Sequence, residues 1–104
     1  MPFRGRREQH LTEEQRAIKW TRGPMDGPFR TWTAKDLPNG CTAVLFAEDV
    51  YGVRGGHRSI FGYQVFAADG RMVEDSKPPG GWERWVCVKN VHSVATKAGA
   101  DVAA

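Results

Sequence analysis

Glycine and proline turns divide most of this chain into short segments, and this feature constrains the fold more than any other. Twelve glycines and six prolines among 104 residues are above average for a globular protein. The strongest local signal is Asp69-Gly70, which predicts a two-residue hairpin turn between strands at Ser59–Ala67 and Arg71–Asp75. Segments of this length and spacing favour antiparallel β-structure over a helical bundle.

Three further strands are expected at a similar spacing. They are predicted at Phe29–Lys35, Cys41–Glu48 and Trp82–Val91. In Ser59–Ala67 the alternate residues give two partly apolar faces, and Gly62 fits a bend within the strand. Such faces are covered by a helix, closed by curling of the sheet into a small barrel, or placed against a partner.

The segment before these strands predicts a short helix. Thr12 and Gln15 have the spacing of a capping box, and the helix must end by Gly23-Pro24. A helix of this length needs a surface to dock on, because isolated short helices are marginal in water. Small residues dominate the sequence from Ala95 onward, which is therefore expected to be coil.

The chain is thus predicted to be an α+β protein. We expect one short N-terminal helix plus a strongly bent or barrel-like antiparallel sheet of four to five strands in meander order. Residues 1–10 are expected to form a flexible basic arm, residues 11–94 a single domain, and residues 95–104 a disordered tail.

The formal net charge of +3 comes from the N-terminal segment. Residues 1–22 hold six basic and three acidic side chains, which leaves nine of each sign in residues 23–104. The six basic residues are Arg4, Arg6, Arg7, Arg16, Lys19 and Arg22. Arginine pairs bidentately with phosphate, so this segment predicts contacts to a nucleic-acid backbone, although a merely solubilising terminus has the same composition.

A glycine-rich segment is the second candidate anion site. Its cations are Arg54, His57 and Arg58, and its glycines permit close backbone approach to a phosphate. It matches neither a P-loop nor a dinucleotide fingerprint, and an ordinary connecting loop is the alternative. Trp82 and Trp85, beside a proline-rich loop, are the aromatic side chains expected to be exposed and to stack on bases. Core packing is the alternative for every ring in a domain this small.

No enzyme activity, metal or cofactor is expected. His10, His57 and His92 are scattered without ligand spacing, and no serine has a nucleophile-elbow context. Cys41 and Cys87 are expected to be free thiols. No apolar run is long enough to cross a membrane and no secretory signal opens the chain, so a cytoplasmic location is expected.

Two functions therefore remain open. The leading hypothesis is a small module that contacts nucleic acid through the basic arm and the Gly/Arg loop, with DNA and RNA not distinguished. Deletion of residues 1–10 is then expected to weaken binding and flatten its salt dependence. The alternative is a protein–protein adaptor or inhibitor that docks an aromatic face or a sheet edge on a larger protein, and such an edge also permits a homodimer.

Overall fold

The computed structural model of this chain describes residues 10–51, 57–77 and 83–103, with the side chains of residues 51, 57, 58 and 99–103 left out. Five antiparallel strands follow one another across a single sheet in meander order. The strands are β1 (Thr21–Arg22), β2 (Arg30–Ala34), β3 (Thr42–Tyr51), β4 (His57–Phe66) and β5 (Met72–Ser76). The helices are α2 (Glu13–Arg16), the 3₁₀ turn η1 (Pro38–Gly40) and α3 (Arg84–Ala103). The predicted α+β class is confirmed.

The sheet is open, and β1 and β5 form its two edges. Of the alternatives in the prediction, the closed barrel is therefore not formed. The central pair runs from Thr42 opposite Phe66 to Tyr51 opposite His57. The expected alternation in β4 holds, since Tyr63 and Val65 are buried on the face that carries the main core.

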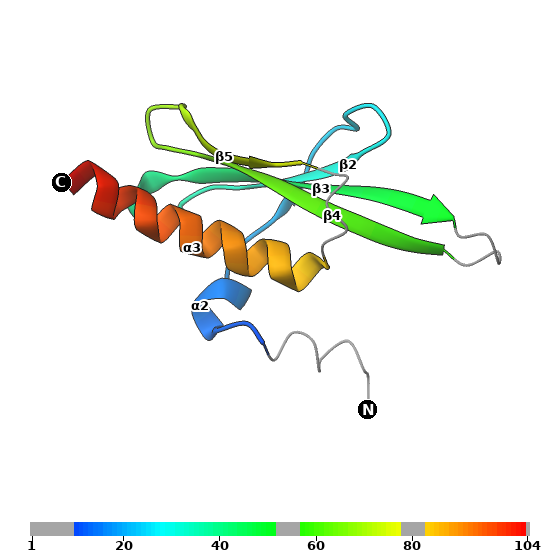
Figure 1. Ribbon diagram of the computed structural model, residues 1–104, viewed down its shortest axis with the longest axis horizontal. Coiled ribbons are helices and arrows are strands. Elements are labelled where there is room, and N and C mark those ends of the chain that lie inside the picture. The colour runs from blue at the N-terminus through cyan, green and yellow to red at the C-terminus, as the bar shows by residue number, and fades with distance from the viewer. Residues whose placement is uncertain (1–9, 52–56, 78–82, 104) are drawn as a thin grey trace.

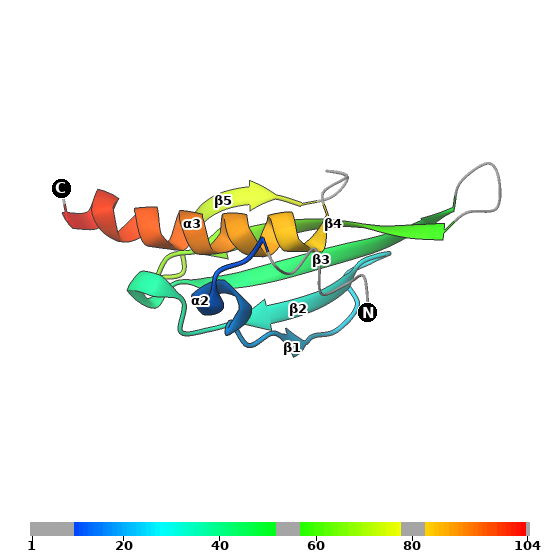
Figure 2. The same cartoon turned by 90° about the horizontal axis from the view of Figure 1, so that it is seen from below.

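A long C-terminal helix covers that face of the sheet, running along its strands in both views (Figures 1 and 2). The predicted strand at Trp82–Val91 is therefore wrong, since α3 begins at Arg84 and Trp82 lies outside the described residues. The alternation of aromatic and β-branched residues that favoured a strand extends over only a few positions. Cys87, Val91 and Ala95 are instead all fully buried at the four-residue spacing of a helix face.

The expected coil from Ala95 is wrong for the same reason. Helix α3 continues to Ala103, and Ala95 and Ala98 belong to the main core. Small side chains at these positions allow the helix backbone to approach the sheet closely, which is a packing role that composition alone does not reveal. None of the described helices is long and apolar enough to span a membrane.

The N-terminal helix is shorter than predicted, although its cap is confirmed. The Gln15 backbone amide donates to Thr12 Oγ1 at 3.1 Å, and the Thr12 amide donates to Gln15 Oε1 at 2.9 Å. Only one turn follows, because Ile18 and Trp20 alternate toward the core and the chain then forms β1. Pairing with β2 therefore replaces the rest of the predicted helix.

Two of the predicted turns are confirmed. The Asp69-Gly70 hairpin joins β4 to β5, but Ala67 pairs with Arg71 and the loop holds three residues, with Gly70 at a φ of 91°. This is a turn closed by a glycine bulge rather than a two-residue turn. At the same end of the sheet, Asn39 adopts a φ of 61° within η1, as the Asn-Gly pair predicts.

The opposite face of the sheet is partly covered by the connector between β1 and β2. Gly23 lies so close to Thr31 that an added Cβ atom would meet its hydroxyl at 2.7 Å. Phe29 then packs edge-on against Phe46, and the Lys77 ammonium lies over both rings. These contacts anchor both ends of the connector and so fix the position of β1 at the sheet edge.

Candidate nucleic-acid interface at the β1–β2 edge

The structure describes only part of the predicted phosphate-binding set. Arg4, Arg6, Arg7, Arg54 and Trp82 lie outside the described residues. The backbones of His57 and Arg58 begin β4, where they pair with Tyr51 and Val50, but their side chains also lie outside the described set.

One predicted cation is placed against an aromatic ring. Arg22 is the cross-strand partner of Trp32, and its guanidinium carbon lies 5.3 Å from the centre of that ring. Arg30 lies two residues before Trp32 on the same face of β2, and its guanidinium carbon lies 5.5 Å from the ring. The Trp32 ring is half-buried against the core, so the sheet holds it in place beneath two cations.

Arg30 is further fixed by a polar network from the central strands. Its Nη2 donates to Asp49 Oδ1 at 2.8 Å and to Ser59 Oγ at 3.1 Å, and the serine hydroxyl also donates to Asp49 at 2.8 Å. The buried Nε of Arg30 has no hydrogen-bond partner among the described residues. Arg30 thus has a fixed position and a largely compensated charge, whereas Arg22 is exposed and its only described contact is the ring.

Two further lysines lie at the same edge of the sheet. Lys19 and Lys35 are both exposed, and neither forms an ion pair with a described residue. They continue the register in which Thr21 faces Thr33, so they lie opposite each other on the face of Thr21 and Thr33, which is not the face of Arg22 and Trp32. We refer to Lys19, Arg22, Arg30, Trp32 and Lys35 as the basic edge.

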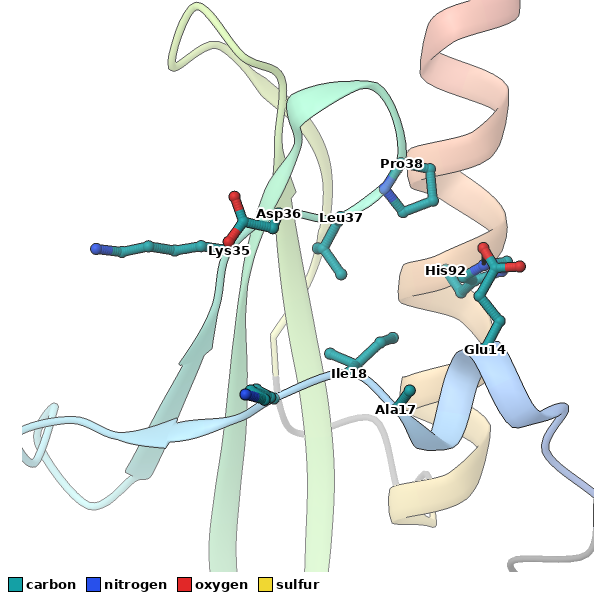
Figure 3. Close-up of a pocket in the computed structure, with 9 residues that line it drawn as sticks. Glu14, Ala17, Ile18, Lys35, Asp36, Leu37, Pro38 and His92 are labelled. Carbon is teal, nitrogen blue, oxygen red and sulfur yellow. Dashed lines mark hydrogen bonds and ion pairs between the residues drawn. The ribbon is translucent and has the colours of Figure 1, made fainter.

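The two lysines also line two adjoining clefts. The smaller has a volume of about 300 Å³ and includes Thr21, Thr33 and Asp36 in its walls. The larger, of about 570 Å³, lies between α2, the segment after β2, and α3. Figure 3 shows Lys35 and Asp36 at one end of the larger cleft, Glu14 and His92 at the other, and Ile18 and Leu37 between them.

The far wall of the larger cleft is held by a contact between two helices. His92 Nε2 on α3 lies 2.8 Å from Glu14 Oε1 on α2. The Glu14 side chain is 73% exposed, so the pair contributes little stability, although it joins α2 to α3 at this end of the cleft.

Two other predicted contacts lie apart from the basic edge. Arg16 is exposed on α2. Trp85, expected to be exposed, is half-buried at the start of α3, where it stacks on His10 at 4.7 Å between ring centres and donates to Glu83. Among the tryptophans that the structure describes, the one with arginines over its ring is Trp32 instead.

Three buried side chains, those of Tyr63, Cys41 and Cys87, have raised pKa values. Burial, reinforced by a hydrogen bond to Glu74, raises the pKa of Tyr63 to about 12. Burial also raises the pKa of Cys87 to about 12 and raises that of Cys41, so neither free thiol forms a thiolate at neutral pH. Within the described residues, no three histidine, cysteine, aspartate or glutamate side chains are placed to hold a metal ion.

Comparisons with family models, curated proteins and solved structures found no match to this chain. The candidate interface therefore rests on the geometry of the basic edge alone. Sequence reasoning missed Arg30 and Lys35, because they lie in the charge-balanced part of the chain. The Arg30-Thr31-Trp32 spacing, which places two side chains on one strand face, is the signal that identifies Arg30.

Proposed function

We propose that this protein is a small binding module, without catalytic activity, that contacts single-stranded nucleic acid through the basic edge. The observation that carries the proposal is the placement of two guanidinium groups, those of Arg22 and Arg30, over the ring of Trp32. Guanidinium planes and aromatic rings are the groups on which unpaired bases stack, and the same cations pair with backbone phosphates.

The cations of the basic edge have two different roles in this proposal, which are support of the aromatic ring and contact with phosphates. Arg30 is held by Asp49 and Ser59, so it supports the ring more than it supplies net charge. Arg22, Lys19 and Lys35 are exposed cations with no described ion pair, and each can neutralise one phosphate and release counterions. A narrow edge with stacking planes favours a single strand over a duplex, whose bases are already stacked.

A fluorescence titration tests the proposal. Labelled single strands and duplexes of DNA and RNA are titrated with the protein at two salt concentrations, and anisotropy reports binding. We expect saturable binding of single strands that weakens steeply with salt. Replacement Arg22→Gln should reduce the slope of log K against log salt by about 0.7, the value for one phosphate contact on a single strand.

The matched control is Arg71→Gln, which removes an exposed arginine from the β4–β5 hairpin at the other side of the sheet. Its binding should equal that of the wild type. Absence of binding to every strand at low salt, or equal losses in the two variants, would contradict the proposal.

A protein–protein adaptor is the second candidate, and one observation favours it. Met25 and Met72 are large apolar side chains that are 57% and 46% exposed. Exposed methionines are frequent at adaptable protein-binding surfaces. Under this alternative, the double variant Met25→Ser with Met72→Ser should abolish capture of a protein partner while leaving strand binding and the thermal melt unchanged.

A further inference from the structure

We infer that the larger cleft beside the basic edge holds a nucleotide with a terminal phosphate monoester, either free or as the 5′ end of a strand. The inference rests on the proposed function and names the part of a strand that this site would receive. It comes from a juxtaposition in the structure: Lys19 and Lys35, which form no ion pair with a described residue, stand at one end of an apolar-floored cleft, and a histidine–glutamate pair closes the other.

The volume of the cleft suits a ligand of this size. At about 570 Å³ it falls within the range of small-molecule pockets, which is roughly 300–1,000 Å³. Its floor combines Ala17 and Ile18 from the segment after α2 with Leu37 and Pro38 from the segment after β2 (Figure 3). A planar base can lie on such an apolar floor, since burial of a ring against aliphatic side chains is favourable.

The charges of the cleft suit a phosphate at one end. Lys19 and Lys35 both line it, and neither has an ion-pair partner among the described residues. Asp36 at the same end balances one of the two positive charges and leaves one excess cation for an anionic group. A monoester carries a greater negative charge than an internal diester, so two lysines that line one cleft favour a strand end over the chain interior.

The remaining polar groups fit the rest of a nucleotide. Asp36 stands in a left-handed backbone conformation with a φ of 58°, and its carboxylate can accept hydrogen bonds from a sugar hydroxyl or a base amino group. At the far wall, the ring nitrogen and carboxylate of the His92–Glu14 pair border the floor on which the base would lie.

The test compares strands that differ only in the terminal phosphate. One labelled single strand is prepared with and without a 5′-phosphate, and the label is placed at the 3′ end. We expect the wild-type protein to bind the phosphorylated strand about tenfold more tightly, the gain typical of charge-assisted hydrogen bonds. Adenosine monophosphate should compete for this site, whereas adenosine should not.

Variants assign the preference to the cleft. In Lys19→Gln with Lys35→Gln the ratio of the two affinities should fall to about one. The matched control is Lys89→Gln with Lys97→Gln, which removes two exposed lysines of α3 that do not line the cleft. All four lysines are exposed, so thermal melts should show that both double variants remain folded.

The outcomes separate this inference from the proposed function. Equal binding of both strands by the wild type overturns the inference and leaves the proposed function standing. Competition by adenosine monophosphate without any binding of unphosphorylated strands supports the cleft and contradicts the proposed function. A phosphate preference that survives in the Lys19/Lys35 variant overturns the assignment to this cleft.

Discussion

The two edges of the sheet carry opposite charges and use them differently. At the β5 edge, Glu74 accepts from Tyr63, and Asp75 accepts from Gln64 and from the Lys77 backbone amide. Both acids are therefore tied to the sheet. At the β1–β2 edge, Arg22 rests on an aromatic ring and the two lysines have no described ion pair. Charge that is already used in hydrogen bonds within the sheet is less available to a ligand, so we propose the β1–β2 edge, and not the β5 edge, as the contact surface.

The largest expected effect is a loss of stability at alkaline pH, because two buried groups keep their protons in the folded chain. The pKa values of Tyr63 and Cys87 are both raised to about 12 by burial. Above pH 9 the unfolded chain loses the Cys87 proton while the folded chain keeps it, so stability is complete below pH 9 and falls as pH rises toward 12. The free energy of unfolding should fall by about 1.4 kcal/mol per pH unit for each such group.

Urea denaturation across this pH range measures that fall. The variant Cys87→Ala removes one titrating group and should show a shallower decline than the wild type, although its stability at neutral pH will be lower because a buried sulfur is lost. An identical pH dependence in both proteins would show that the Cys87 thiol is not protected by the fold.

A smaller effect is expected from the acidic edge itself. Glu74→Ala removes the acceptor of the Tyr63 hydroxyl and should lower the free energy of unfolding by about 1 kcal/mol. Glu74→Gln keeps an acceptor oxygen at the same place and should lose less than half as much. Equal losses in the two variants would mean that the charge, and not the hydrogen bond, holds this edge.

The smallest effect on stability is expected at the basic edge. Arg22 is exposed and contributes one cation–π contact, so Arg22→Gln should change the free energy of unfolding by no more than about 0.5 kcal/mol. Arg30→Gln should cost more, because it also breaks the contacts to Asp49 and Ser59. Urea denaturation measures both losses. A larger loss in Arg22→Gln than in Arg30→Gln would contradict the distinction between Arg22, whose only described contact is the ring, and Arg30, which is also held by hydrogen bonds.

Much of the fold was predictable because its signals are local. The capping box at Thr12 and the turns at Asn39 and Gly70 each depend on residues within a few positions of one another. Helix α3 was missed because its valines favour strands locally, and only the sheet shows why Cys87, Val91 and Ala95 form one buried face. Tertiary packing decided that segment.

The site was less predictable than the fold. Counting charges along the chain identified Arg22 and Lys19 but passed over Arg30 and Lys35, which lie in the part of the chain with equal numbers of basic and acidic residues. Their grouping depends on the strand register that places β1 beside β2. A two-residue strand has no sequence signal strong enough to predict that pairing.

The most direct test of the central claim is the salt dependence of single-strand binding in variants of the two edges. The wild type, Arg22→Gln and Glu74→Gln are titrated with one labelled strand over a series of salt concentrations. The account predicts a slope lower by about 0.7 in Arg22→Gln and an unchanged slope in Glu74→Gln. Equal slopes in all three proteins, or a change confined to Glu74→Gln, would contradict the assignment of binding to the basic edge.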